Sequence, residues 1–313
     1  MKLRIATRGS ALARWQAEHV AAALRGAHPD LDIELVLVQT TGDGTSAPLS
    51  SISTIGLFTR EVDRAVLDER ADAAVHSLKD LPTVSTHGLH IAAIPRREDP
   101  RDAFVPAPGI AGRIADLPAG ARIGTSSLRR RALLLEQRPD LLVLELRGNV
   151  DTRIAKLTAH ELDGGVLAYA GLRRLGRADV AGEVLDALTW LPAPGQGALA
   201  VVARADDVRT SRFVSVLDDP ATRSATTAER TLLRVLEGGC HVPIGALATV
   251  HGERIALAGF VASPDGSSRR RGSITGPLLR AAQLGEDLAD ALLHDGADEI
   301  LRQARTASAT AQP

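Results

Sequence analysis

The chain of 313 residues is poor in cysteine and in aromatic residues, with one Cys, two Trp, one Tyr and four Phe. A single cysteine cannot form an internal disulfide, so nothing in the chain requires an oxidising compartment. With so few aromatic rings, aliphatic side chains must fill the cores, and recognition by stacking on bases or sugars is disfavoured. No apolar run approaches the roughly 20 residues that span a bilayer. The N-terminus also lacks the apolar region of a signal peptide. We therefore expect a cytoplasmic monomer that binds no membrane.

Lysine is scarce as well: Lys2, Lys79 and Lys156 are the only three, and arginine makes up the rest of the 37 basic residues. The net charge of −1 argues against a nucleic-acid partner. A GC-rich genome would explain much of the arginine excess but not its placement. Residues 122–177 hold ten Arg and one Lys against six acids, many of them near glycine-containing turns. Arginine in such positions suits bidentate binding of carboxylates or phosphates.

The order of strand-like and helix-like patterns predicts two α/β lobes followed by a different domain. Strand and helix patterns alternate in the first half, beginning with a strand near residues 3–6 and a helix over 11–25 with Ser10 as N-cap. The segments "REDPRD" and "LPAPGQG" mark two crossings between the lobes, and "ALAVVAR" is typical of a strand that returns to the first lobe. Two crossings imply a ligand cleft at the hinge.

From about residue 218 the pattern changes. It predicts a helix over 221–237, a three-stranded antiparallel meander, two closing helices and a frayed tail from residue 305. The predicted fold class is therefore α/β with three domains, two of them lobes and the third an α+β domain with a three-stranded antiparallel sheet. The expected boundaries are 1–96 with 197–216 for domain 1, 97–196 for domain 2 and 217–313 for domain 3.

Four stretches place arginine at a turn or a helix start: "TRGS", "GTSSLRR", "LRGNVDTR" and "AGLRRLG". Free N–H groups and the dipole at a helix N-terminus already favour anions, and neighbouring guanidinium groups strengthen that preference. Each stretch alone is better explained by solvated arginine. Together, at the strand ends of a two-lobed fold, they indicate a site for a polycarboxylate or phosphate ligand. In the last stretch, Arg173 and Arg174 are expected at a strand exit.

Two further segments carry residues with open interpretations. In "AVHSLKDLPT", Asp80 is either a turn residue before the proline or a cleft carboxylate that the neighbouring Lys79 keeps ionised. His76 has no second ligand at metal spacing, so we expect a structural hydrogen bond there and no metal. Cys240 in "EGGCHVPIG" is either a small buried residue or an accessible thiol, and its flexible glycines favour access.

These segments occur in the order and spacing found in one family, porphobilinogen deaminases (hydroxymethylbilane synthases), which the chain resembles from about Leu3 to Leu301. The shared motifs are "RIATRGS", "AVHSLKDLPT", "REDPRDAFV", "GTSSLRRRA", "LRGNVDTR", "AGLRRLG", "LPAPGQGAL", "TAERTLL" and "LEGGCHVPIGA". The resemblance implies two lobes like those of type II periplasmic binding proteins and a third domain that carries the cysteine. It also implies a transferase of tetrapyrrole and heme biosynthesis that joins four porphobilinogen molecules head to tail with release of ammonia, and then releases hydroxymethylbilane by hydrolysis.

The resemblance further implies a covalent dipyrromethane cofactor, bound to Cys240 through a thioether, and the partners porphobilinogen and the growing linear polypyrrole. Asp80 resembles the family's catalytic aspartate. The implied cofactor-binding residues are Cys240, Lys79, Thr125, Ser127, Arg129, Arg130, Arg147 and Gly148. The implied substrate-binding residues are Arg8, Ser10, Phe58, Arg153, Arg174 and Gln196.

The sequence predicts a mobile loop at residues 41–54, and the chain departs from the family pattern directly after it. Ile55 stands where many members have lysine, and Arg60 stands where lysine is common. A lysine contact from this loop is therefore not expected here. The alternative function is a non-catalytic anion-binding protein of the same two-lobed fold, for which the domain that carries Cys240 would have no use.

Overall fold

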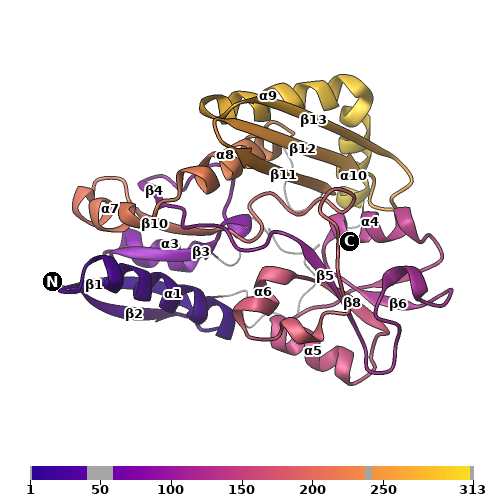
Figure 1. Cartoon of the computed structure of the whole chain (residues 1–313), viewed down its shortest axis with the longest axis horizontal. Helices are drawn as coiled ribbons and strands as arrows, with labels where there is room; N and C mark the ends of the chain where they lie inside the picture. The colour runs from indigo at the N-terminus through magenta and orange to yellow at the C-terminus, as the bar shows by residue number, and fades with distance from the viewer. Residues whose placement is uncertain (1, 41–58, 237–241, 311–313) are drawn as a thin grey trace. The chain divides into compact units, whose positions relative to one another are not determined.

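The computed structural model describes residues 2–40, 59–236 and 242–310 (Figure 1). By its internal contacts the chain forms two compact units. Unit 1 comprises Met1–Glu98 and Gly197–Arg223, and unit 2 comprises Asp99–Gln196 and Ser224–Pro313. Unit 2 thus contains most of two of the three predicted domains, and the three-domain division stays a prediction. No helix among the described residues is long and apolar enough to cross a membrane.

Unit 1 is built on a five-stranded sheet of order β2-β1-β3-β10-β4. Its strands are β1 (Lys2–Arg8), β2 (Asp32–Val38), β3 (Ala73–Ser77), β4 (Leu89–Ala93) and β10 (Leu199–Arg204). Its helices are α1 (Ala11–Ala27), α3 (Arg60–Leu67) and α7 (Val208–Val214). The strand β1 is parallel to β2 and β3, whereas β10 is antiparallel to β3 and β4. The expected return strand is therefore confirmed.

Unit 2 contains a second five-stranded sheet with the same pattern, in the order β7-β6-β8-β5-β9. Its strands are β5 (Asp102–Pro106), β6 (Arg122–Gly124), β7 (Leu142–Leu144), β8 (Gly164–Ala168) and β9 (Glu183–Val184). Its helices are α4 (Leu128–Gln137), α5 (Val150–Thr158) and α6 (Tyr169–Arg174). Here β6 is parallel to β7 and β8, and the antiparallel strand is β5. This strand begins at the end of the first crossing segment and was missed by the sequence analysis.

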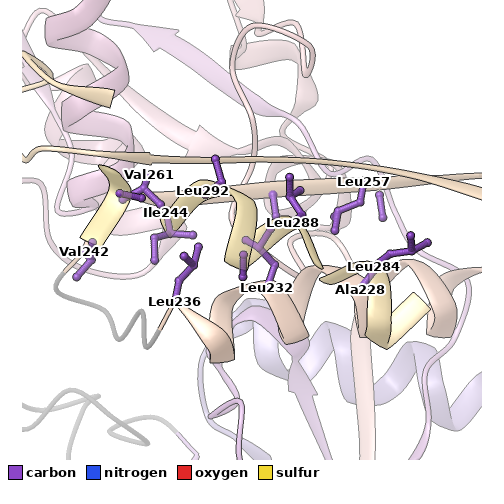
Figure 2. Close-up of a cluster of buried hydrophobic side chains, with 14 of the residues drawn as sticks. Ala228, Leu232, Leu236, Val242, Ile244, Leu257, Val261, Leu284, Leu288 and Leu292 are labelled. Carbon is purple, nitrogen blue, oxygen red and sulfur yellow. The ribbon is translucent and has the colours of Figure 1, made fainter. Parts of the chain in front are cut away.

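The last part of unit 2 has the predicted antiparallel meander of β11 (Ile244–His251), β12 (Arg254–Ala262) and β13 (Arg269–Pro277). Three helices accompany it: α8 (Pro220–Val235), α9 (Ala281–Leu292) and α10 (Asp298–Thr310). Leucines of α8 and α9, among them Leu232 and Leu288, pack with Leu257 and Val261 of β12 in one core (Figure 2). The predicted α/β class with a separate three-stranded sheet is confirmed. The tail is shorter than expected, because α10 continues to Thr310.

Glycine allows α8 and α9 to approach closely, and this gives a test of the packing. A Cβ added at Gly285 of α9 would lie 2.5 Å from the carbonyl oxygen of Ala228 and 3.0 Å from the backbone nitrogen of Leu232. We expect Gly285→Ala to lower the free energy of unfolding by about 1–3 kcal/mol, the usual cost of overpacking. The control is Gly26→Ala in α1, where an added Cβ meets nothing within 4 Å. That change should stabilise the protein by up to about 1 kcal/mol through helix propensity. Chemical denaturation of both variants measures the effects, and equal values would contradict the close approach.

Candidate active site

In unit 1 the predicted residues gather where two parallel strands end. The strand β1 ends at Arg8, and its parallel neighbour β3 ends at Ser77, directly before a single 3₁₀ turn, Leu78–Asp80. Carboxyl ends of adjacent parallel strands lie at the same edge of a sheet, which is where α/β proteins bind ligands. Ser10 follows Arg8 and caps α1 by accepting a hydrogen bond from the backbone N–H of Ala13 at 3.4 Å. Arg8, Ser10 and the Leu78–Asp80 turn are therefore brought to one edge of this sheet.

Asp80 and Lys79 are exposed in this turn, whereas the strand before them is firmly anchored. Gln16 of α1 donates from Nε2 to Oγ of Ser77 at 2.9 Å, and His76 Nε2 lies 3.0 Å from Oδ1 of the buried Asp63. In the described part of the chain, no backbone N–H donates to the Asp80 carboxylate, as it would in a side-chain-stabilised turn. The contact between His76 and Asp63 is a close approach of the two side chains, and neither atom has a hydrogen-bond partner among the described residues, so the structural hydrogen bond of His76 stays a prediction. The described residues include no group of three potential metal ligands.

In unit 2 the predicted residues gather at the carboxyl ends of β6 and β7. Thr125 and Ser127 follow β6, and Oγ1 of Thr125 accepts the backbone N–H of Ser127 at 3.1 Å. Ser127 is the N-cap of α4. Asn149 is the N-cap of α5, where its Oδ1 accepts the backbone N–H of Thr152 at 2.8 Å. Two helix N-termini therefore open at one edge of the sheet, an arrangement that favours anions.

Three further arginines that we predicted as ligand-binding residues lie on elements beside this edge. Arg147 lies 2.7 Å from the carboxylate of Glu145, and Arg153 donates from Nε to the carbonyl of Gly148 at 2.8 Å. Arg174 is buried at the end of α6. The expectation that Arg173 and Arg174 follow a strand directly was wrong, because β8 ends at Ala168 and a helical turn intervenes. Both residues therefore lie at the end of α6, one helical turn beyond the end of β8.

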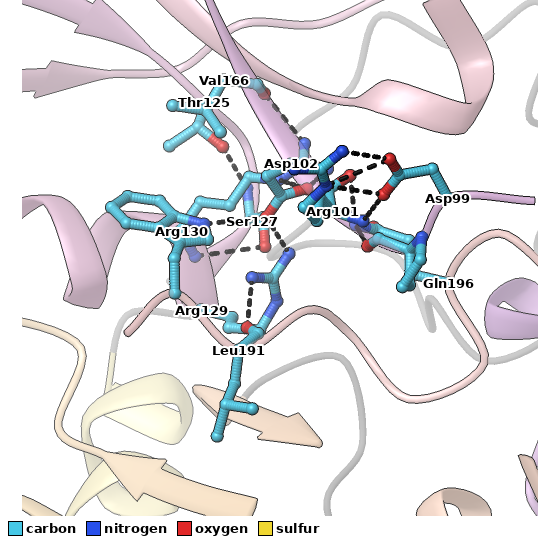
Figure 3. A network of polar contacts seen from close by, with 12 residues as sticks. Asp99, Arg101, Asp102, Thr125, Ser127, Arg129, Arg130, Val166, Leu191 and Gln196 are labelled. Carbon is cyan, nitrogen blue, oxygen red and sulfur yellow. Dashed lines mark hydrogen bonds and ion pairs between the residues drawn. The ribbon is translucent and has the colours of Figure 1, made fainter. Parts of the chain in front are cut away.

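Arg129 and Arg130, in the first turn of α4, are buried and share one carboxylate, that of Asp102 at the start of β5 (Figure 3). Nη2 of Arg129 donates to Oδ2 of Asp102 at 2.8 Å, and Nη2 of Arg130 donates to Oδ1 at 2.8 Å. Nε1 of Trp190 and Nε2 of Gln196 also donate to Asp102, at 2.9 and 2.8 Å. Each arginine also donates from Nη1 to a main-chain carbonyl, Arg129 to that of Leu191 and Arg130 to that of Val166, each at 2.9 Å.

The two guanidinium groups explain why the buried Asp102 carboxyl is ionised. Burial alone would raise the pKa of Asp102, but the guanidinium groups of Arg129 and Arg130 outweigh burial and hold that pKa far below its usual range. Burial lowers the pKa of Arg129, and Asp102 opposes this effect. Arginine stays protonated in proteins. The cluster therefore contains one negative and two positive charges.

Arg129, Arg130 and Gln196 were expected from the sequence. No role was expected for Asp102, which binds all three, or for Trp190, which donates to Asp102. The expectation that each arginine binds a ligand carboxylate stays a prediction, and it must accommodate the carboxylate that both already share. Cys240 and Phe58, together with Ile55 and the loop at residues 41–54, lie outside the described residues. The available signal for Asp102 was its place directly before the apolar run "AFV", since a carboxylate at the start of a buried strand needs a partner.

Comparison with known proteins gives the class. The family model described as "Porphobilinogen deaminase, dipyromethane cofactor binding domain" matches residues 3–212, and that of the porphobilinogen deaminase C-terminal domain matches residues 224–294. The chain is similar to porphobilinogen deaminases of Geobacter metallireducens (48% identical) and Geobacter sulfurreducens (47%), over 96% of this chain and 94% of each relative. Among solved structures it is similar to the methionine-binding protein MetQ, at 13% identity and a TM-score of 0.46, over 69% of this chain and 89% of that one.

The chain belongs to the porphobilinogen deaminase family. It is thus a transferase of tetrapyrrole biosynthesis that uses a dipyrromethane cofactor. Membership that extends over both the N-terminal and the C-terminal family domains favours the enzyme over the non-catalytic alternative.

The residues at the edge in unit 2 suit such a cofactor. Each of its pyrroles carries an acetate and a propionate, so a binding site needs cations and N–H donors. Arg129 and Arg130 retain one positive charge after pairing with Asp102, and the buried Nε of Arg129 has no hydrogen-bond partner among the described residues. The N-termini of α4 and α5 offer main-chain N–H groups beside them.

Gly148 provides a test of the loop between β7 and α5. Its φ of +111° disfavours other residues, and an added Cβ would lie 2.7 Å from Cβ and Cγ2 of Thr152. We expect Gly148→Ala to lower the free energy of unfolding by about 1–3 kcal/mol, and to displace the carbonyl that Arg153 binds. Gly120→Ala is the control, because its φ of +75° is also positive but an added Cβ meets nothing within 4 Å. Denaturation of both variants should show the larger loss for Gly148→Ala, and a smaller loss there would refute a steric role for Thr152.

Proposed function

We propose that the chain joins porphobilinogen units head to tail on a dipyrromethane cofactor held by Cys240, and then releases hydroxymethylbilane by hydrolysis. The observation that carries this proposal is the cationic edge in unit 2, where Arg129 and Arg130 retain a net positive charge beside two helix N-termini. A polypyrrole that gains two carboxylates with each added unit needs such positive charge and N–H donors. The partners are porphobilinogen and the growing linear polypyrrole. The cytoplasmic location and the monomeric state stay predictions from the sequence.

The proposed binding residues fall into two groups. In unit 2, the N–H and guanidinium donors hold acetate and propionate groups. In unit 1, residues at the ends of β1 and β3 hold the incoming substrate and serve its chemistry. The first group comprises Thr125, Ser127, Arg129, Arg130, Arg147, Gly148, Arg153, Arg174 and Gln196. The second group comprises Arg8, Ser10, Phe58, Lys79 and Asp80.

Asp80 has the catalytic role in this proposal. When the aminomethyl C–N bond of porphobilinogen breaks, the electron pair leaves with ammonia and the substrate becomes a cationic azafulvene. An exposed carboxylate stabilises that positive charge and accepts hydrogen bonds from pyrrole N–H groups. When bound, the cofactor supplies the free pyrrole α-carbon to which the first unit is joined. The exposed side chain of Asp80, at the end of an anchored strand, is free to make these contacts.

Replacing Asp80 tests this role. Asn keeps the shape and the turn preference but removes the charge, so we expect a folded Asp80→Asn protein with turnover lower by roughly 10²-fold or more. Asp80→Glu keeps the charge and should retain more activity than Asp80→Asn. The measurement is single-turnover elongation after mass spectrometry has confirmed equal cofactor content. Near-normal rates for the Asn variant would return Asp80 to the role of a turn residue.

Replacing the cysteine tests the attachment. The chain has no other thiol, so we expect Cys240→Ala to fold, to carry no dipyrromethane and to have no activity. Intact mass should show an adduct of two pyrrole units on the wild-type protein and none on the variant. Colour with Ehrlich's reagent provides a second readout. Normal turnover by Cys240→Ala would exclude the thioether.

A further inference from the structure

We infer that Asp102 is a positioning residue, which sets the orientation and the net charge of Arg129 and Arg130 before any ligand binds. The inference rests on the proposed role of these arginines in holding carboxylates. Asp102 is completely buried and its carboxylate accepts hydrogen bonds from four side chains. Arg129 and Trp190 donate to Oδ2, while Arg130 and Gln196 donate to Oδ1.

The two neutral donors fix the carboxylate. Trp190 and Gln196 each bind a different oxygen, so the group cannot rotate without breaking a buried hydrogen bond. The chain just before Asp102 is held as well. Arg101 binds the Asp99 carboxylate through Nε and Nη2, and Nε2 of Gln196 also donates to the carbonyl of Pro100 at 2.8 Å (Figure 3). The carboxylate therefore has one position, and it imposes that position on the guanidinium groups.

The guanidinium groups are held at both ends. Arg130 reaches Oδ1 of Asp102 with Nε and Nη2 while its Nη1 donates to Val166, and Arg129 is held between Asp102 and the carbonyl of Leu191. Groups fixed in this way bind a ligand without first losing side-chain freedom. One carboxylate between two cations also leaves a net charge of one for an anionic ligand. Two buried cations without Asp102 would repel each other and lose their shared acceptor.

The test removes or moves this carboxylate and follows formation of the cofactor adduct. Asp102→Asn places an amide N–H against guanidinium donors, and Asp102→Glu keeps the charge but moves the oxygens by one methylene. The control is Asp163→Asn, which removes an aspartate that binds Arg122 at the start of β6. Each full-length chain is expressed in a host that supplies no porphobilinogen. Folding is checked by circular dichroism and thermal unfolding, and each protein is then incubated with porphobilinogen at several concentrations.

Intact mass gives the initial rate of two-pyrrole adduct formation per folded protein, and its concentration dependence gives an apparent KM. We expect the rate at low porphobilinogen to fall by about tenfold or more for Asp102→Asn, the loss typical of hydrogen bonds to charged groups. Asp102→Glu should fall between this variant and wild type, and Asp163→Asn should match wild type. A purely structural role for Asp102 predicts lower melting temperatures with unchanged rates.

A folded Asp102→Asn protein that forms adduct at the wild-type rate and KM overturns the inference. If Asp102→Asn does not fold, Asp102→Glu decides instead, since a wild-type rate for folded Asp102→Glu shows that the position of the carboxylate is immaterial. Failure of the proposed function looks different, because the wild-type chain itself would then form no adduct. Arg129→Leu tests the premise that the arginine binds the ligand, with Arg254→Leu on the exposed start of β12 as its control. If wild type and Arg129→Leu form adduct at the same rate, Arg129 does not bind the ligand, and the inference about Asp102 is overturned with it.

Discussion

A single buried carboxylate organises the arginine-bearing part of unit 2. A charge that is removed from water must be paired and hydrogen-bonded, so the surroundings of Asp102 have little freedom. The pairing fixes three elements together: β5 through Asp102 itself, α4 through Arg129 and Arg130, and the segment from Trp190 to Gln196. Asp102 follows the point where the chain enters unit 2, and Gln196 is the last residue before it leaves for β10. The hydrogen bond from Gln196 to Asp102 thus joins, within unit 2, the two segments of the chain next to the crossings.

The two five-stranded sheets share one strand order but present different chemistry at their carboxyl edges. In each sheet one strand, β1 or β6, lies between two parallel neighbours, and one antiparallel strand, β10 or β5, follows a crossing of the chain. At the edge in unit 1 the carboxylate, Asp80, is exposed, and the role proposed for it in stabilising a cation needs that exposure. At the edge in unit 2 the carboxylate, Asp102, is buried and serves to hold cations. Exposure leaves Asp80 able to contact a ligand, whereas burial commits Asp102 to the protein's own arginines.

The sequence was sufficient wherever the signal is local. Ser10 and Ser127 cap α1 and α4 through hydrogen bonds that span three residues, and such caps can be recognised from residue type and position. The bonds to Asp102 span 27 to 94 residues and leave no local pattern. The strand β5 was missed because "DAFVP" is short and follows charged residues and a proline. Arg173 and Arg174 were assigned to a strand exit because "AYAGLRR" has neither a cap nor a breaker that separates strand from helix.

The network also explains why arginine is required at two positions in a chain where it is common everywhere. Arg130 spans from the Asp102 carboxylate to the carbonyl of Val166, and Arg129 spans from the same carboxylate to the carbonyl of Leu191. A guanidinium can do this because its donors point outward from a rigid plane in different directions. A lysine concentrates its three donors on one nitrogen, so it could pair with Asp102 or reach the main chain but could not fix its own orientation by doing both. This geometry accounts for the presence of arginine at these two positions.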